Sequence, residues 1–405
     1  MNVIIEKSKA KGAVKAPPSK SMAHRYLLCA ALSAGESTIS GVDFSKDIEA
    51  TINCLKALGS EIKNENDTVT VKGIKSFTET EITGDLLCNE SGSTLRFLIP
   101  VCLLYNKKIR FKASVRLLER SLSVYEDICA ENGFYFEKGK DTLTLCGKLK
   151  SGIYNIPGDI SSQFISGMLF ALPLLEGESV INVLGKFESE SYINLTLKAL
   201  NDFGIKIERK DNSFYIKGNQ KYTAVNKCVE GDYSNAAFLD LFNFLGGEVE
   251  ISGLDENSLQ GDRIYKNYFP MLCKDGAVLD ISDCPDLGPV LMAAAAALNG
   301  AVLTGTKRLK IKESDRGEAM REELLKFGIR VICEENKITV CNGELKAPDA
   351  VLNSHNDHRI VMSLAVLCSL TGGEIQDAQA VEKSFPDYFE KINSLGIKTR
   401  RQNGD

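Results

Sequence analysis

The sequence predicts an α/β protein of two similar domains, each made of three copies of one repeating unit. Six apolar helical segments recur along the chain, and each follows a short polar or glycine-bearing stretch. The complete copies start about 70 residues apart, and a fixed period of this kind indicates internal duplication. A chain of 405 residues with 43% hydrophobic and 25% charged side chains is also long enough to bury two cores.

The first unit begins in residues 17–28, which read PPSKSMAHRYLL. The two prolines end an extended segment, and we expect Ser19 to cap a helix that continues into the apolar residues 26–32. Lys20 and Arg25 lie at this helix start, where the helix dipole favours an anion by about 0.3–1 kcal/mol. On one helix such cations are more often solvated surface charges. Their recurrence at other helix starts indicates a site for anions instead.

The rest of the first unit contains a short strand, a second helix and a terminal hairpin that ends at Gly73. The second helix is predicted from its spacing, because Ile48, Ile52, Leu55 and Leu58 fall on one face. The same order returns in residues 89–147, 158–218 and 283–343, and each of these second helices ends near a glycine. Helical segments at 231–239 and 355–364 begin the two remaining units.

Two units are incomplete, and they determine the predicted domain boundaries. The fourth, residues 231–282, is short in its second half, and the sixth, from His355, lacks a last strand. The N-terminal segment NVIIEK is available to supply that strand. We therefore expect residues 1–15 and 229–405 to form a discontinuous domain around an inserted domain of residues 16–228. If the three units of a domain close into one compact body, their helix starts point to a common end of that domain. Because helix starts attract anions, we expect an anion site between the two domains.

Charge and cysteine usage restrict the class of function. A net charge of -5 gives no general attraction to nucleic acid or to an anionic membrane, so neither is expected as a partner. No run of 18 apolar residues and no signal-peptide pattern occur, which predicts a cytoplasmic protein. The twelve cysteines show no CxxC pair, and we interpret them as small buried thiols in a reducing compartment.

The residues that could carry chemistry are cations at helix starts, together with a few polar neighbours and two carboxylates. The basic ones are Lys20, Arg25, Arg96, Arg120, Lys312, Arg316, Arg359 and Lys383. Ser161, Ser162 and Gln163 suit a polyol that carries a phosphate, although SSQ alone is more often a helix cap. Asp286 and Glu313 stand among the cations as candidates for proton transfer, while a cap and an ion-pair partner are equally plausible alternatives from the sequence.

No cofactor is predicted. His355 and His358 are three residues apart, but no third ligand is signalled, so we expect no metal. Neither common glycine-rich nucleotide fingerprint is present, so NAD and ATP are not supported.

Taken together in order and spacing, eight motifs resemble the enolpyruvyl transferases, and most closely the branch that acts on 3-phosphoshikimate. They are PPSKSMAHR (17–25), ESGSTLR (90–96), LLER (117–120), DISSQF (159–164), Asp286, KIKESDR (310–316), NDHR (356–359) and EKSFPDYFE (382–390). The resemblance covers essentially the whole chain. It implies two domains of three βαβαββ units each, in the inside-out α/β barrel of that family. It also implies transfer of the enolpyruvyl group of phosphoenolpyruvate to the 5-hydroxyl of 3-phosphoshikimate.

The resemblance further implies a role for individual residues. Those expected to hold 3-phosphoshikimate are Lys20, Ser21, Arg25, Ser161, Ser162, Gln163, Ser189, Tyr192, Asp286 and Lys312. Those expected to hold phosphoenolpyruvate are Lys20, Gly92, Arg120, Gln163, Arg316, Arg359 and Lys383. Asp286 and Glu313 match the proton-transfer pair, and Lys20 is expected to share in the proton traffic. We expect these two metabolites as the only partners of a monomer.

The sequence departs from the family pattern at four positions, and it disfavours three other functions. Glu90, Ser93, Ser121 and Arg308 replace residues that the family usually has. The nearest alternative is the sister transferase that acts on UDP-N-acetylglucosamine, which commonly has a cysteine before the matching arginine; residues 112–120 have none. A cyclase of RNA 3'-phosphate ends is disfavoured by the acidic chain, and a repeat scaffold without activity by the presence of both carboxylates.

Overall fold

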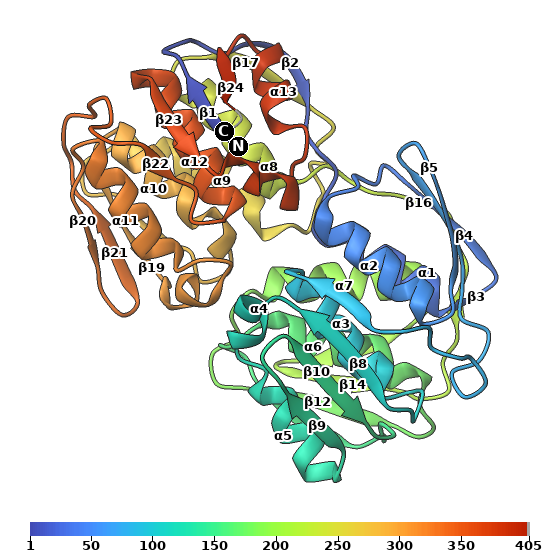
Figure 1. Cartoon of the computed structure of the whole chain (residues 1–405). Helices are drawn as coiled ribbons and strands as arrows, with labels where there is room; N and C mark the ends of the chain where they lie inside the picture. The colour runs from blue at the N-terminus through green and yellow to red at the C-terminus, as the bar shows by residue number, and fades with distance from the viewer. Residues whose placement is uncertain (403–405) are drawn as a thin grey trace. The chain divides into compact units, whose positions relative to one another are not determined.

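The computed structural model describes residues 1–402, and Figure 1 shows it as a ribbon. The chain divides into two compact units, Met1–Pro17 with Glu230–Asp405 and Pro18–Val229. We call the second the inserted unit and the first the discontinuous unit. The sequence-based boundaries differ from this division by two residues at the first crossing and by one at the second.

Within residues 1–402, five of the six repeats share one arrangement, a four-stranded mixed sheet accompanied by two main helices. In the sheet of the second repeat the strand order is β7 (Leu86–Asn89), β8 (Ile109–Ala113), β10 (Thr142–Cys146) and β9 (Tyr135–Lys138). The first strand is parallel to the second, and the hairpin strands that follow are antiparallel to their neighbours. The four-stranded sheets within residues 153–216 and 278–340, from the third and fifth repeats, have the same order, as the predicted repeats require.

The inserted unit contains three of these repeats. Its helices are α1 (Lys20–Leu32), α2 (Lys46–Ala57), α3 (Gly92–Cys102), α4 (Val115–Glu119), α5 (Ser123–Asn132), α6 (Ser162–Ala171) and α7 (Glu190–Asp202). Its strands are β3 (Ser33–Ala34), β4 (Glu36–Ser40), β5 (Glu61–Glu65), β6 (Thr68–Lys72), β7 (Leu86–Asn89), β8 (Ile109–Ala113), β9 (Tyr135–Lys138), β10 (Thr142–Cys146), β11 (Ile153–Pro157), β12 (Ser179–Leu184), β13 (Ile207–Lys210), β14 (Ser213–Ile216), β15 (Tyr222–Thr223) and β16 (Lys227–Cys228). The short β16, from the end of the unit, pairs in parallel with β4 and completes the first sheet.

The discontinuous unit contains the other three repeats. Its helices are α8 (Tyr233–Phe244), α9 (Tyr265–Leu272), α10 (Gly288–Ala297), α11 (Arg316–Lys326), α12 (His358–Thr371) and α13 (Tyr388–Ser394). Its strands are β1 (Asn2–Ile5), β2 (Lys11–Lys15), β17 (Glu248–Ser252), β18 (Val278–Asp280), β19 (Ala301–Thr304), β20 (Val331–Cys333), β21 (Lys337–Val340), β22 (Leu352–Asn353), β23 (Gly373–Gln376) and β24 (Thr399–Gln402).

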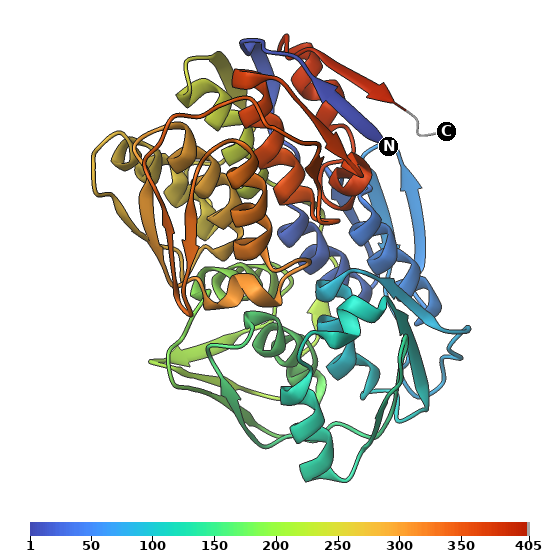
Figure 2. The same ribbon diagram turned by 60° about the vertical axis from the view of Figure 1, so that its left-hand side comes forward.

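The N-terminal segment enters the sheets of this unit at two places, as Figure 2 lets the reader follow. Strand β1 lies between β23 and β24 and is antiparallel to both, so it takes the position that β21 has in the preceding repeat. Strand β2 pairs in parallel with β17, in the short fourth repeat that has no terminal hairpin. The sixth repeat is thus completed by a strand from the N-terminus, which is held in the sheet by hydrogen bonds to β23 and β24.

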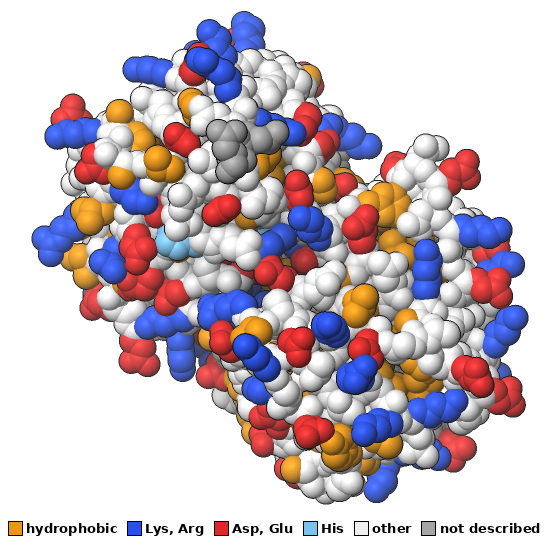
Figure 3. Space-filling view, viewed as in Figure 1, with side chains coloured by type: hydrophobic (Ala, Val, Ile, Leu, Met, Phe, Trp, Pro, Cys, Tyr) orange, Lys and Arg blue, Asp and Glu red, His pale blue; other side chains and the backbone are white. Residues whose placement is uncertain are grey.

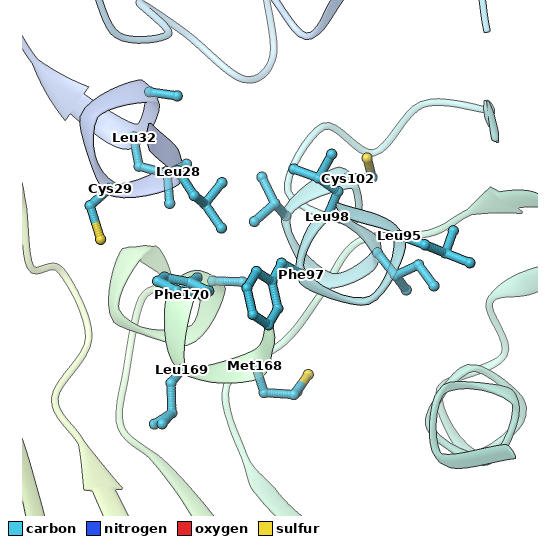
Figure 4. Close-up of a cluster of buried hydrophobic side chains, with 14 of the residues drawn as sticks. Leu28, Cys29, Leu32, Leu95, Phe97, Leu98, Cys102, Met168, Leu169 and Phe170 are labelled. Carbon is cyan, nitrogen blue, oxygen red and sulfur yellow. The ribbon is translucent and has the colours of Figure 1, made fainter. Parts of the chain in front are cut away.

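Each unit has its own apolar core, and the first helices of the repeats lie inside it. In the inserted unit, α1, α3 and α6 converge on one cluster, where Phe97 and Phe170 meet edge to face with ring centroids 5.3 Å apart (Figure 4). The predicted apolar stripe of α2 is confirmed, because Ile48, Ile52 and Leu55 are all buried. In the discontinuous unit, α8, α10 and α12 fill the corresponding core.

The interpretation of the cysteines was only partly right. Seven are buried, but Cys146, Cys333 and Cys341 are half-buried, and Cys228 and Cys273 are exposed. The surface drawn in Figure 3 carries lysine, arginine, aspartate and glutamate side chains interspersed with one another. Within residues 1–402, no helix is both long and apolar enough to cross a membrane.

Candidate active site

The candidate residues form clusters within each unit, and the discontinuous unit holds both predicted proton-transfer carboxylates. Asp286 lies in a 3-10 turn (Pro285–Leu287) directly before α10, so it does not cap that helix. Glu313 lies in the loop before α11, and Arg316 is the first residue of α11. Local sequence therefore places all three at helix starts, and the packing of the repeats brings them together.

Arg316 is the centre of what we call the Arg316 cluster, which comprises Asp286, Lys312, Glu313, Arg316, Asp357 and Arg359. Its Nη1 lies 2.8 Å from Asp286 Oδ1, and its Nη2 lies 2.7 Å from Glu313 Oε2. Its Nε donates to Asp357 Oδ2 at 2.8 Å. One guanidinium group thus orients three carboxylates, two of which are the predicted pair.

Asp286 has two further cationic partners. Lys312 Nζ lies 3.0 Å from Asp286 Oδ1, and Arg359 Nη2 lies 3.1 Å from Oδ2. Burial alone would raise the pKa of Asp286, but Arg359, Lys312 and Arg316 together hold it well below its usual value. Asp286 is therefore an ionised carboxylate at neutral pH, as a proton acceptor has to be.

The pKa values of two cations in the cluster are also shifted. Burial lowers the pKa of Lys312 to about 8, with Asp286 opposing this and the neighbouring charges of Arg308 and Arg316 adding to it. For Arg316, burial is outweighed by Asp357, Glu313 and Asp286, which raise its pKa. Lys312 is thus the cation of this cluster that can lose its charge in the physiological range.

Lys383 lies beside the cluster, at the end of a 3-10 helix (Ala378–Lys383). Its Nζ donates to the backbone carbonyl of Asn356 at 2.6 Å, and Asn356 directly precedes the aspartate that caps α12. The structure therefore brings Asp286, Lys312, Glu313, Arg316, Arg359 and Lys383 into one neighbourhood.

The remaining candidates lie in the inserted unit, in two groups. In the first, Arg25 donates from Nη1 to the carbonyl of Ser21 at 2.7 Å and from Nη2 to that of Tyr192 at 2.9 Å. Burial lowers the pKa of Arg25 to about 10, which leaves it charged at neutral pH. Lys20 Nζ lies 2.9 Å from Asp47 Oδ2, an ion pair that joins α1 to α2. The predicted cap is confirmed, since Ser19 Oγ accepts from the backbone amide of Met22.

Ser189 belongs to the same group through α7, which begins one residue later. It is fully buried and has φ +54°, a left-handed conformation that a serine rarely adopts. Such strain persists where the surrounding structure imposes it, and it is most common at functional sites.

The second group surrounds Gly92 at the start of α3. A Cβ atom added there would lie 2.9 Å from Arg96 Nη1 and 3.1 Å from Arg120 Nη1, so both guanidinium groups approach the bare glycine backbone. Arg96 donates to Gln163 Oε1 at 3.0 Å, and Gln163 Nε2 donates to Ser93 Oγ at 3.0 Å. The serine that departs from the family pattern thus orients the predicted substrate-binding glutamine.

The serines before Gln163 also belong to this group. Ser161 caps α6 and accepts from the amide of Gln163 at 3.3 Å, and Ser162 is the first residue of the helix. The SSQ segment is therefore a helix cap, which does not exclude a ligand at the same helix start.

Sequence reasoning did not assign roles to Asp357, Arg96 and Asp47. Asp357 is fully buried, and it also caps α12 by accepting from the amide of Arg359 at 2.9 Å. An aspartate directly before an apolar helix was the available signal, but its partner Arg316 lies 41 residues away. Arg96 was recognised as a cation at a helix start, and its bond to Gln163 spans 67 residues.

The expected helical segment from residue 355 was wrong at its start, which changes how the two histidines lie. His355 lies outside α12, which begins at His358, so the two histidines do not share a helical face. Among residues 1–402, the histidine–carboxylate group compatible with a metal is Glu322, Glu323 and His355. Lys326 Nζ lies 3.0 and 2.9 Å from the two carboxylate oxygens of Glu323. Its positive charge would repel a metal ion bound to the same carboxylate.

Known proteins resemble this chain over nearly its whole length. A family model described as EPSP synthase (3-phosphoshikimate 1-carboxyvinyltransferase) matches residues 4–272 and 268–392. The curated 3-phosphoshikimate 1-carboxyvinyltransferase of Clostridium kluyveri is 42% identical over 97% of this chain and 97% of its own. That of Clostridium botulinum strain Alaska E43 is 41% identical over 96% of both.

Solved structures show the same fold at lower identity. An EPSP synthase from Acinetobacter baumannii superposes with a TM-score of 0.81 at 23% identity, covering 99% of each chain. The enolpyruvyl transferase NikO from Streptomyces tendae superposes with a TM-score of 0.78 at 14% identity, covering 100% of this chain and 99% of its own. The predicted fold of the enolpyruvyl transferases is therefore confirmed, and with the family model and the clostridial relatives it follows that the chain belongs to the EPSP synthase family.

Proposed function

We propose that this chain transfers the enolpyruvyl group of phosphoenolpyruvate to the 5-hydroxyl of 3-phosphoshikimate, giving 5-enolpyruvylshikimate 3-phosphate and inorganic phosphate. The reaction is a step of the shikimate pathway, which leads to chorismate and the aromatic amino acids. The observation that supports it best is the Arg316 cluster, where one guanidinium among further cations holds both the ionised Asp286 and the carboxyl group of Glu313. The names of the clostridial relatives support the same acceptor.

The binding roles follow from charge. Both substrates are multiply charged anions, and their mutual repulsion has to be offset by converging cations. Arg120, Arg316, Arg359 and Lys383 hold phosphoenolpyruvate, and Gly92 leaves room for it against the backbone. Lys20, Arg25 and Lys312 hold 3-phosphoshikimate, with the hydroxyl and amide groups of Ser21, Ser161, Ser162, Gln163, Ser189 and Tyr192.

The chemistry is an addition followed by an elimination. Asp286 accepts the proton of the 5-hydroxyl as the oxygen attacks C2 of phosphoenolpyruvate, and Glu313 delivers a proton to C3. The tetrahedral adduct then loses a proton from C3 and expels phosphate, and Lys20 shares in this proton traffic.

We also propose that the two units contribute to one site. The residues assigned to each substrate are divided between the inserted and the discontinuous unit, so neither unit holds a complete set. Substrate binding is then expected to draw the units together. Small-angle scattering tests this, because identical dimensions with and without both substrates would contradict closure.

The direct test of the function is release of inorganic phosphate from the two substrates. We expect release with phosphoenolpyruvate and 3-phosphoshikimate, and none when UDP-N-acetylglucosamine replaces the shikimate compound. The clostridial relatives and the lack of cysteine in residues 112–120 both favour this acceptor over the sugar nucleotide. A folded sample that releases no phosphate from the first pair would overturn the proposal. We further expect the enzyme to act in the cytoplasm as a monomer.

A further inference from the structure

A further carboxylate, the buried Asp262, lies beside the Arg316 cluster and has no role in the mechanism above. It belongs to a 3-10 turn (Gly261–Ile264) and is 4% exposed. The preceding Gln260 fixes this turn against the start of α8, since its Oε1 accepts from the amide of Tyr233 at 3.0 Å and its Nε2 donates to the carbonyl of Gly231 at 2.8 Å. Asp262 is thereby held beside Ser234, in the first turn of α8.

Ser234 connects Asp262 to the cluster. Its Oγ accepts from Arg359 Nη1 at 2.7 Å, and its side chain is hydrogen-bonded to Asp262. A hydroxyl has a single hydrogen, so Ser234 accepts from the guanidinium and donates to the carboxylate. Arg359 in turn contacts Asp286, which completes a chain from Asp262 through Ser234 and Arg359 to the proposed proton acceptor.

The charge of Asp262 is sensitive to pH near neutrality. Burial raises the pKa of Asp262 to about 7, the charge of Asp286 adds to this, and Arg359 and the bond from Ser234 oppose it. Asp232, which caps α8, contributes a further negative charge. Cys284 is a further titratable neighbour in this unit, and its thiol is kept neutral because burial raises its pKa.

We propose that Asp262 is a positioning residue of the enolpyruvyl transfer: its negative charge fixes Arg359 through Ser234 and makes Asp286 a stronger proton acceptor. The inference rests on the proposed function. Its physical basis is reciprocity, because two interacting carboxylates raise the proton affinity of one another. Asp286 is otherwise held by three cations in a state of low proton affinity, which is unfavourable for a general base.

The sign of the effect follows from the titration. Above pH 7 Asp262 is ionised, Asp286 is the stronger base and turnover is high; below pH 7 Asp262 is neutral and turnover falls. If the charge of Asp262 changes the proton affinity of Asp286 about tenfold, kcat changes roughly three- to tenfold across this transition. In Asp262→Asn the side chain is neutral throughout, so kcat is expected to stay at the low level. At pH 8 the KM of Asp262→Asn for phosphoenolpyruvate should not exceed that of the wild type, because the substitution removes a negative charge near an anion site.

The experiment is the pH profile of kcat from pH 5.5 to 9 for the wild type, Asp262→Asn and a control, Asp240→Asn. Asp240 is a carboxylate on the same helix as Ser234, and it is bonded to Tyr265 rather than to the cluster. The inflection near pH 7 should disappear in Asp262→Asn and persist in the control. Ser234→Ala, which removes a bond that lowers the pKa of Asp262, should move the inflection to higher pH, and Ser234→Thr should restore it. An unchanged inflection in Asp262→Asn or in Ser234→Ala would overturn the inference.

A second measurement is independent of turnover. The raised pKa means that the folded protein binds a proton that the unfolded chain has lost between about pH 4 and 7. The urea midpoint of the wild type should therefore fall relative to that of Asp262→Asn as pH rises through this range. A constant difference would contradict the titration of Asp262. A wild type that shows this shift but releases no phosphate would refute the proposed function and leave the titration established.

Discussion

The ion pair between Asp357 and Arg316 allows the sharpest prediction about what holds the site together. Both side chains are almost completely buried, at 0% and 1% exposed. Asp357 also accepts from Ser314 Oγ at 3.1 Å and from the amide of Arg359. The substitution Asp357→Asn keeps the size of the side chain and its ability to cap α12, so it removes mainly the charge.

The expected cost follows from the burial of the partner. Removing one member of a buried pair leaves the other charge without compensation, which typically costs about 3–5 kcal/mol. Arg316 keeps Asp286 and Glu313, so we expect the lower end, about 3 kcal/mol. This is a large part of the stability of a domain, about 5–15 kcal/mol.

The effect also has a defined pH dependence. Burial would raise the pKa of Asp357, but Arg316 outweighs it and the pKa is lowered overall. The pair therefore stabilises the fold above the pKa of an unfolded aspartate, about 3.9, and its contribution is lost as pH falls through the lower folded value. The difference in the free energy of unfolding between the wild type and Asp357→Asn should therefore be largest at pH 7, and it should become smaller as the pH falls into the acid range.

Urea unfolding of the wild type, Asp357→Asn, Arg316→Met and the double variant measures these quantities. We expect the double variant to lose less stability than the sum of the two single variants, because neither charge of the Asp357–Arg316 pair is then left buried without the other. A loss below about 1 kcal/mol in Asp357→Asn, or strict additivity in the cycle, would refute the argument that this pair is a buried, mutually dependent unit.

Three further outcomes are expected. Glu313→Gln should lower kcat by roughly a hundredfold or more with little change in the affinity for 3-phosphoshikimate, as loss of a general acid does, and near-normal turnover would make Glu313 only an ion-pair partner. Because Lys312 has a pKa of about 8, kcat/KM for 3-phosphoshikimate should decline above pH 8 as the positive charge is lost. Lys312→Arg should move that decline to higher pH, because arginine keeps its charge. A decline at the same pH in both proteins would assign it to another group. Val3→Asp places a charge at a fully buried position of β1 and should destabilise the discontinuous unit by more than about 3 kcal/mol in urea unfolding, whereas a change under about 0.5 kcal/mol would show that β1 contributes little.

Local signals predicted the helix starts and the strand supplied by the N-terminus. Ser19 was recognised as a cap because proline, a hydroxyl and an apolar run follow one another within a few residues, and its bond to the amide of Met22 is of that local kind. The place of β1 could be predicted because one repeat visibly lacked a strand. The parallel pairing of β16 with β4 had no such signal, since Lys227–Cys228 is too short to show any periodicity.

The site was predicted as a set of residues but not as a set of contacts. Charge at helix starts identified Arg316 and Arg359, because such positions disfavour cations unless an anion joins them. The sequence could not show that Asp357 would bind Arg316, that Arg96 would bind Gln163 or that Asp262 would lie behind Arg359. These pairs are distant along the chain, and only the packing of the repeats decides which of many carboxylates meets a given cation.

Two matched lysines test the proposal that residues of both units hold one substrate molecule. Lys20 in the inserted unit and Lys312 in the discontinuous unit are 18% and 17% exposed, and each is paired with one aspartate. Calorimetric titration of 3-phosphoshikimate into the wild type, Lys20→Met and Lys312→Met gives the dissociation constant and the stoichiometry. We predict one site per chain and a loss of affinity of about tenfold or more in each variant, as expected when a charged hydrogen bond is removed. Wild-type affinity in either variant would contradict a shared site.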